Sequence, residues 1–129
     1  VVQANYWRGT FPSTNLRIDG FMTSPVGAFP ANGHGPYDMV GNVWEWTADW
    51  YADRHACAAS PCCVPRNPRG TSEDRSRDLL APGSPIGRRV LKGGSHLCAP
   101  DYCRRYRPAA RYPQPIDTST SHVGFRCAH

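Results

Sequence analysis

The sequence has little lysine, no long hydrophobic run and no internal repeat. Only one of its fifteen basic residues is lysine, and arginine suits planar carboxylates and phosphates better than lysine does. No apolar run approaches the roughly 18 residues of a membrane-spanning helix, and the start lacks the pattern of a signal peptide. We therefore expect a soluble protein with no membrane partner. The lack of repeats and heptads excludes solenoids and coiled coils.

Length and composition favour a single loop-rich unit. The chain has 129 residues, enough for one domain but not two. Its 13 prolines remove backbone donors at many positions, which makes long helices and wide sheets hard to build. The chain opens without methionine, inside strand-like or loop-like sequence. We expect a loop-rich fold, and we expect residues 1–129 to be a fragment of one domain.

The net charge of +5 raises nucleic acid as a partner. Arginines and tyrosines interleave in one cluster, formed by Tyr102, Arg104, Arg105, Tyr106, Arg107, Arg111 and Tyr112. No nucleic-acid-binding motif surrounds this cluster, and such pairs are more often structural. We therefore expect no nucleic-acid partner.

Three segments show strand patterns. Trp44, Trp46, Ala48 and Trp50 alternate with polar residues, which predicts a half-buried strand whose tryptophans form a core seam. Residues 89–92 and 122–128 predict two further strands, whereas Pro108 argues against a central strand over 103–111. Residues 52–87 are polar and proline-rich, which indicates a long surface excursion.

Two cysteines, Cys98 and Cys103, lie five positions apart beside one lysine and three arginines. Nearby positive charge favours the thiolate, so we expect low pKa values and soft ligands for Cu(I), zinc or an iron–sulfur cluster. Two ligands suit two-coordinate Cu(I), with His96 as a third ligand or a hydrogen-bonded wall. From spacing alone, a disulfide or two buried thiols is the stronger interpretation.

Oxygen-bearing residues form a second candidate site. Asn5 and Asp19 flank a glycine-containing loop, and Asp38, Gly41, Asn42 and Glu45 fall within eight residues. Such oxygens could hold a hard cation such as calcium. Turns and caps around the glycines are the favoured interpretation from spacing alone.

Several strings resemble a known family. GPYDMVGNVWEWT at 35–47, VLKGGS at 90–95 and GFRCA at 124–128 resemble the sulfatase-modifying-factor superfamily. CAPDYCRRYRPAAR at 98–111 is similar to the formylglycine-generating enzymes within it. The resemblance runs nearly end to end, yet covers only the carboxy-terminal part of such a catalytic domain. It implies that residues 1–129 are the carboxy-terminal portion of one domain, with an incomplete α+β fold of the C-type-lectin-like kind, in which short strands are joined by long loops.

The resemblance also implies an activity. Such an enzyme uses O2 to oxidise a cysteine in a Cys-x-Pro-x-Arg segment of an unfolded sulfatase to formylglycine. Cys98 and Cys103 match the family's copper pair, which holds Cu(I) linearly, with the substrate thiolate as third sulfur. Ser95 matches a serine that lines the pocket and positions substrate or oxygen. A monomer is expected at full length, and the isolated chain is expected neither to fold nor to turn over.

Structural calcium sites are implied as well. They match residues in two sets, Asn5, Tyr6 (carbonyl), Asp19 and Phe21 (carbonyl), and then Asp38, Gly41 and Val43 (carbonyls) with Glu45. Two departures, Pro108 in place of a cysteine and Cys127 without a disulfide partner, favour a bacterial-type, cytoplasmic enzyme over a secretory one. The inserted Cys57, Cys62 and Cys63 suggest only a stabilised loop.

Two alternatives remain. One is a calcium-dependent, lectin-like binding module in which Trp44, Trp46 and Tyr51 stack on a ligand. The other is a non-haem-iron sulfoxide-synthase relative with the same fold. That branch does not need the Cys98/Cys103 pair, so the pair argues against it.

Overall fold

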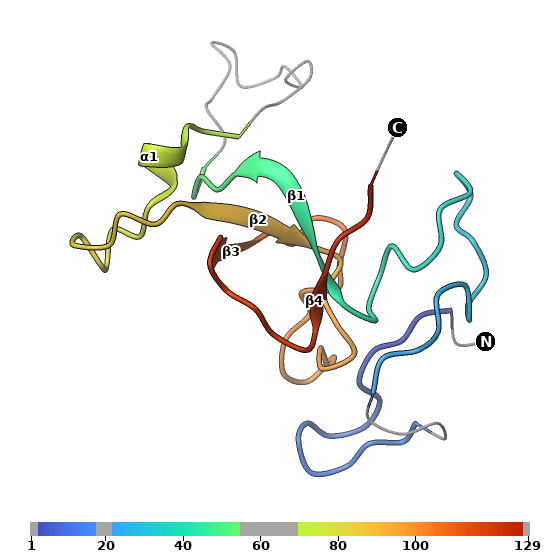
Figure 1. The fold of residues 1–129 in the computed structure, drawn as a ribbon. Coiled ribbons are helices and arrows are strands. Elements are labelled where there is room, and N and C mark those ends of the chain that lie inside the picture. Colours follow the sequence, from blue (N-terminus) through green and yellow to red (C-terminus); the bar gives the residue numbers. More distant parts are fainter. Residues whose placement is uncertain (1–2, 18–21, 55–69, 128–129) are drawn as a thin grey trace, which may run out of the picture.

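Short strands and long loops make up the protein. The computed structural model describes residues 3–17, 22–54 and 70–127. In chain order these contain β1 (Trp44–Trp50), α1 (Glu73–Ser76), β2 (Arg88–Lys92), β3 (Tyr112–Pro115) and β4 (Val123–Gly124) (Figure 1). The expected α+β architecture with little regular secondary structure is therefore confirmed, while its lectin-like character stays a prediction. No helix in these ranges is long and apolar enough to cross a membrane.

The four strands form one mixed sheet in the order β3-β2-β1-β4. β2 lies between β1 and β3 and pairs antiparallel with both. β4 pairs parallel with β1, placing Val123 opposite Trp44. The chain therefore returns from β3 to the far edge of the sheet before it adds its last strand.

Strand β1 has the predicted bounds, but its tryptophans do not share one buried face. The pairing with β2 shifts register between Trp46 and Trp50, and such an irregularity disrupts simple alternation. Trp44 is buried, Trp46 and Trp50 are half-buried, and Ala48 is exposed. The Arg89 guanidinium lies 3.9 Å from the centre of the Trp50 ring. Trp44 belongs to the buried core cluster and the partly buried Trp46 packs against it, so the core seam is confirmed at these two tryptophans and not at Trp50.

Two other predictions need correction. The strand expected over 122–128 is only the two-residue β4, because residues 125–127 are exposed beyond the edge of the sheet. Strand β3 was not predicted, since its sequence is Tyr-Pro-Gln-Pro. Pro113 and Pro115 pair opposite Val90 and Arg88. They are tolerated because β3 is an edge strand, where a missing donor costs little.

The buried core lies where the sheet meets the loop that follows β2. Trp44, Leu91 and Cys98 form a buried cluster. Cys103, Tyr106 and Tyr112 are among the partly buried side chains that pack against it. The cysteine-bearing loop is thus attached directly to the sheet.

The part of the predicted excursion that can be followed, 70–87, is mostly exposed and carries α1. Ser76, at the end of α1, is fully buried. Its hydroxyl donates to the Glu73 carbonyl at 2.6 Å and accepts the Arg88 N–H at 3.0 Å. This serine connects the excursion to β2. Cys57, Cys62 and Cys63 lie outside the described residues.

Candidate functional site

The sulfur atoms of Cys98 and Cys103 lie 3.1 Å apart. Cys98 is only 2% exposed, whereas Cys103 is half-buried. Both are free thiols, as is the exposed Cys127. The structure therefore brings the predicted pair together, with one sulfur in the core and the other nearer the surface.

Local hydrogen bonds in the loop explain how residues five positions apart meet. The Cys98 N–H donates to the Ser95 carbonyl, and the Cys103 N–H donates to the Ala99 carbonyl, each at 3.0 Å. The Tyr102 N–H donates to the same Ala99 carbonyl at 3.2 Å. Two successive turns thus direct both thiols to the same side.

Gly94 allows the loop to fold back on itself. It has a φ of +69°, a conformation that favours glycine. A Cβ atom at this position would lie 2.7 Å from the Tyr106 Cα. The absence of a side chain lets the backbone around Tyr106 pack directly over the start of the cysteine loop.

The thiol chemistry differs from the sequence prediction. Burial raises the pKa of Cys98 to about 11, and the adjacent Cys103 adds to the rise. Hydrogen bonds from Ser95 act in the opposite direction but do not prevail. The expectation of a low-pKa thiolate at Cys98 is therefore wrong, because desolvation exceeds the effect of the nearby positive charges.

The four neighbouring cations have partners other than the two sulfurs. Arg104 donates to the Pro100 carbonyl and Arg107 to the Arg104 carbonyl. Arg105 lies over the Tyr112 ring, 4.5 Å from its centre. The Lys92 ammonium donates to two backbone carbonyls of the 108–110 segment. These cations stabilise loops and do not pair with the sulfurs. The argument that they lower the pKa of Cys98 therefore does not hold.

Ser95 is buried beside the first cysteine of the pair. It is 1% exposed, and its hydroxyl oxygen accepts the Leu97 N–H at 3.3 Å. Its hydrogen bonds to Cys98 favour the ionised thiol. Ser95 is therefore adjacent to the buried sulfur, and its role toward substrate stays a prediction.

His96 is a hydrogen-bonded wall residue. Its backbone N–H and its ring Nδ1 both contact the Asn42 carbonyl, at 2.9 and 3.0 Å. The sequence left His96 as either a third metal ligand or a hydrogen-bonded residue, and the hydrogen bonds confirm the second interpretation. The pKa of the nearby His122 is lowered, first by burial and then by His96.

The first calcium set can be followed only in part, because Asp19 and Phe21 lie outside the described residues. Asn5 is buried, and its amide nitrogen donates to the Asn42 side chain and to the Ser24 hydroxyl, each at 3.2 Å. Its amide oxygen accepts from the Arg17 guanidinium. Tyr6 packs on another ring near the cysteine loop.

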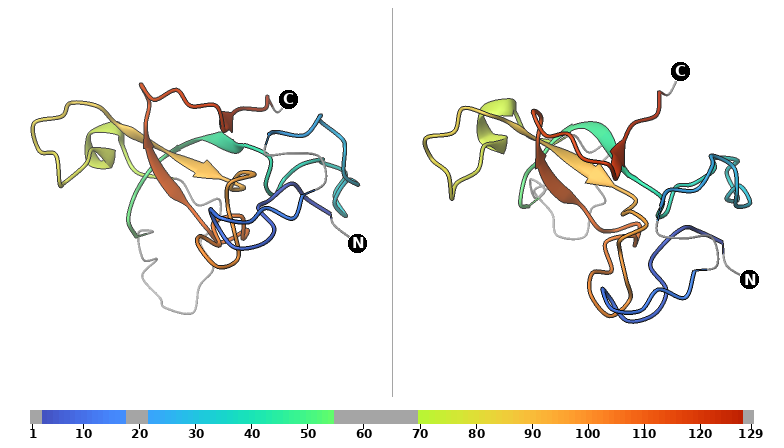
Figure 2. Two further views of the ribbon diagram at one scale, coloured as in Figure 1. Left: turned by 90° about the horizontal axis from the view of Figure 1, so that it is seen from below. Right: turned by 60° about the horizontal axis from the view of Figure 1, so that its bottom comes forward.

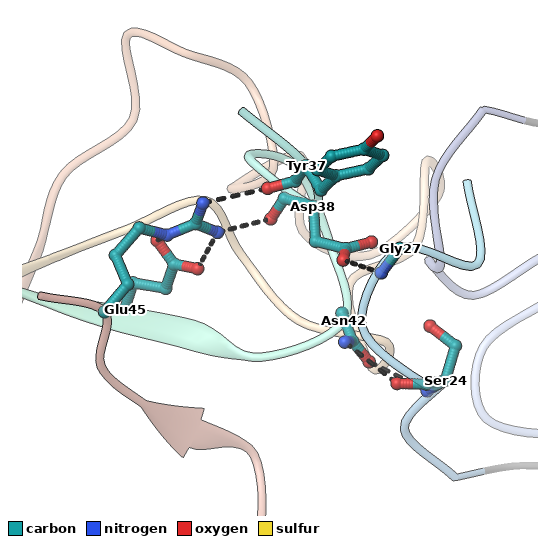
Figure 3. A network of polar contacts seen from close by, with 7 residues as sticks. Ser24, Gly27, Tyr37, Asp38, Asn42 and Glu45 are labelled. Carbon is teal, nitrogen blue, oxygen red and sulfur yellow. Dashed lines mark hydrogen bonds and ion pairs between the residues drawn. The ribbon is translucent and has the colours of Figure 1, made fainter. Parts of the chain in front are cut away.

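Two members of the second calcium set contact the same guanidinium, that of Arg126 (Figure 3). The Asp38 carboxylate accepts the Gly27 N–H at 2.9 Å. The Glu45 carboxylate instead pairs with the Arg126 guanidinium through both of its oxygens. That guanidinium also donates to the Tyr37 and Asp38 carbonyls, at 2.9 and 3.2 Å.

The Asp38 carbonyl, which is the atom that the resemblance names, and the Glu45 carboxylate therefore both accept from the Arg126 guanidinium. Calcium at this set stays a prediction. Gly41 forms an isolated parallel bridge with Asn5, so the two sets are adjacent in space. Val43, the remaining member, is half-buried.

The cysteine pair fits a soft, low-coordination metal. No group of three or more histidine, cysteine or acidic side chains within ranges 3–17, 22–54 and 70–127 could hold a metal ion. The donor set in these ranges is therefore two sulfurs. Structural zinc requires four ligands and iron–sulfur clusters about four cysteines, whereas two thiolates suit Cu(I).

Sequence reasoning missed the contribution of the 6–11 segment. Trp7 donates its backbone N–H to the Cys98 carbonyl at 3.0 Å, and the Phe11 N–H contacts the Asp101 carboxylate. The only signal was a series of aromatic residues in a loop-like segment, because these contacts join residues about ninety positions apart.

Comparisons with known proteins identify relatives of the chain. The chain is 48% identical over 130 residues to the formylglycine-generating enzyme of Mycobacterium tuberculosis, covering 98% of this chain and 40% of the relative. It is 45% identical over 126 residues to the formylglycine-generating enzyme of Mus musculus, covering 97% and 29%. The chain thus spans less than half the length of these relatives.

Two further findings concern the fold. The solved structure of Treponema denticola variable protein 1 matches with a TM-score of 0.55 and 30% identity, over 83% of this chain and 32% of that one. The model of the sulfatase-modifying factor enzyme 1-like domain matches residues 1–129. The chain therefore belongs to the sulfatase-modifying factor enzyme family.

Proposed function

We propose that the chain carries the dithiol site of a formylglycine-generating oxidase. Its substrate is a cysteine in a Cys-x-Pro-x-Arg segment of an unfolded sulfatase, and its product is formylglycine. The observation that carries the proposal is the 3.1 Å separation of the Cys98 and Cys103 sulfurs. Relatives of that name, at up to 48% identity, support the same chemistry.

Cu(I) is the proposed cofactor and O2 the co-substrate. Cys98 and Cys103 would hold the metal, which when bound supplies a centre that binds the substrate thiolate and transfers electrons to oxygen. Conversion of the cysteine side chain to an aldehyde, with water supplying the oxygen and hydrogen sulfide released, removes two electrons, while reduction of O2 to water takes four. An external thiol is therefore the proposed source of the other two.

The chain's own residues set the conditions for this chemistry. Burial of Cys98 excludes water from one side of the site. Because burial raises the pKa of Cys98 to about 11, this sulfur carries a proton near neutral pH, and metal ligation must release it. Ser95 is placed to stabilise the deprotonated sulfur and is the proposed positioning group for substrate or oxygen.

The remaining parts of the proposal concern partners and surroundings. The partner is an unfolded sulfatase polypeptide, and the full-length enzyme is a cytoplasmic monomer of bacterial type. Structural calcium is proposed at the set that includes Asn5. At the second set, calcium would have to displace the Arg126 guanidinium from Glu45.

The test replaces each cysteine of the pair in the full-length protein. Cys98→Ser and Cys103→Ser should abolish aldehyde formation on a Cys-x-Pro-x-Arg peptide and reduce bound Cu(I) from one equivalent toward zero. Cys127→Ser, which removes an exposed thiol, is the matched control and should retain both. Aldehyde formation by either pair variant would defeat the proposal.

A further inference from the structure

The 6–11 segment lies directly against the Cys98–Cys103 loop, far from it in sequence. Both views of Figure 2 show the blue amino-terminal loop beside the orange loop that follows β2. The proposed oxidation assigns this segment no role, and only the carbonyl of Tyr6 belongs to the proposed calcium set. Its contacts nevertheless fall on the backbone and side chains between the two sulfurs.

Two hydrogen bonds attach the segment to the loop. The Trp7 N–H donates to the carbonyl of Cys98 itself, at 3.0 Å. The Phe11 N–H donates to the Asp101 carboxylate at 3.1 Å. Asp101 lies between the two cysteines, so the loop is held at its first cysteine and again near its middle.

Two ring contacts extend the attachment. The Phe11 ring stacks on Tyr102, with centroids 4.5 Å apart and planes at 17°. The Tyr6 ring packs against Tyr106, with centroids 5.3 Å apart. Aromatic pairs of this kind contribute about 0.5–1.5 kcal/mol beyond the area they bury. Tyr102 thus lies between Asp101, which accepts the hydrogen bond from Phe11, and Cys103, the second cysteine of the pair.

The 6–11 segment is itself held in one conformation by its own contacts. Trp7 is 4% exposed, and its indole N–H donates to the Thr14 carbonyl at 3.0 Å. The Trp7 and Phe11 rings meet edge to face at 5.0 Å. A further backbone hydrogen bond closes the loop between Thr14 and Thr10 at 2.8 Å.

We propose that the 6–11 segment holds the Cys98–Cys103 loop in the conformation that keeps its two sulfurs together, with Phe11 and Asp101 as positioning residues. The effect that we expect on copper affinity rests on the proposed function. The effect that we expect on how closely the two sulfurs are held depends on the chain alone. Groups that orient metal ligands typically contribute 10–100-fold to metal affinity.

The first experiment uses no metal. The full-length protein is equilibrated with reduced and oxidised glutathione. In forming a disulfide, Cys98 and Cys103 lose two electrons and two protons, and glutathione disulfide accepts them to give two glutathione thiols. Trypsin cleaves after Lys92 and Arg104, so both cysteines fall in one peptide whose mass reports the oxidised fraction.

Loosening the loop lowers the effective concentration of one thiol at the other. Asp101→Ala and Phe11→Ala should each lower the equilibrium constant for disulfide formation about tenfold, which is a potential about 30 mV less negative. Asp101→Asn keeps a side-chain oxygen to accept the Phe11 N–H and should restore the wild-type value. Phe11→Tyr keeps the stacked ring and should do the same.

The matched control is Asp74→Ala, which removes an exposed carboxylate paired with Arg77, away from the loop. It should leave the equilibrium constant unchanged. Wild-type constants in both alanine variants would overturn the proposal. If Asp101→Asn fell as far as Asp101→Ala, the proposed hydrogen bond would be refuted. Should Phe11→Ala fail to fold by circular dichroism, Phe11→Leu, which keeps an apolar side chain but no ring, must show the shift.

The second experiment measures Cu(I) affinity by competition with a chromogenic chelator. Asp101→Ala should weaken binding at least tenfold, and Asp101→Asn should recover it. If the wild-type protein bound no Cu(I), the proposed function would fail, while the glutathione equilibrium would still decide whether the segment positions the sulfurs. The two failures are therefore distinguishable.

Discussion

Replacing Arg126 with methionine removes the guanidinium that joins the segment after β4 to the loop before β1. The side chain donates to both oxygens of Glu45 and to the carbonyls of Tyr37 and Asp38. Glu45 raises the pKa of Arg126 through this hydrogen bond and its charge. Methionine keeps much of the length of the side chain but none of these interactions.

The magnitude follows from the partial burial of the pair. The Glu45 side chain is 18% exposed and the Arg126 side chain 38% exposed. A hydrogen bond to a charged group contributes about 1.5–3 kcal/mol when shielded, and an exposed ion pair about 0.2–1 kcal/mol. In the full-length protein we expect a loss of about 2 kcal/mol, or roughly 4–8 °C in Tm for a domain about twice the length of this chain.

Thermal unfolding by circular dichroism measures this loss. A double-mutant cycle with Glu45→Gln should give a coupling of about 1 kcal/mol, since the pair is in direct contact. Arg77→Met is the matched control, because its ion pair with Asp74 is largely exposed. It should cost less than about 0.5 kcal/mol.

Calcium provides a second comparison on the same variant. In the wild type the Glu45 carboxylate is already paired with Arg126, so calcium binding at the second calcium set should change the Tm only slightly. In Arg126→Met the oxygens are released, and calcium at about ten times its Kd should restore about 1.4 kcal/mol. Equal calcium stabilisation of both proteins, or a Tm of the variant within about 1 °C of wild type, would refute the reasoning.

Four further predictions concern single residues. At pH 8 iodoacetamide should modify Cys127 well before Cys98, whose alkylation should accelerate as pH rises toward its pKa of about 11; comparable rates by mass spectrometry would contradict this. Because this pKa is raised on folding, the stability that the neutral thiol contributes is present below about pH 9 and lost as pH rises through 11. Gly94→Ala should destabilise the protein by at least about 1 kcal/mol, since its Cβ would meet the Tyr106 backbone; an unchanged urea midpoint would contradict that contact. Ser76→Ala should cost about 1–2 kcal/mol, because it leaves a buried N–H of β2 without its acceptor, and slower exchange of that amide would be the opposite of what we expect.

Local patterns predicted the centre of the sheet. β1 is marked by alternation from Trp44 to Trp50, and β2 ends where Gly93 and Gly94 follow it. β3 could not be found in this way, because two of its four residues are prolines. Only its position at the edge of the sheet, a property of the assembled fold, makes those prolines acceptable.

The site was predicted in its residues but not in its electrostatics. The five-residue spacing and the family resemblance identified Cys98 and Cys103, and the sulfurs do meet. The sequence places cations beside them, but it does not show that those cations face carbonyls and rings instead. Burial, which raises the pKa of Cys98, is likewise determined by packing against Trp44 and Leu91.

The hydrogen bond between Phe11 and Asp101 joins positions ninety residues apart. Closing a loop of that length has a large entropic cost, which grows only slowly with further length, and nonlocal contacts of this kind slow folding. The turns at Ser95 and Ala99 are local and can form early, but the contact with the amino-terminal loop must wait until most of the chain has collapsed. We therefore expect the paired thiols of the proposed copper site to be among the last features to mature, so that a metal ion offered to a partly folded chain would meet sulfurs that are still apart.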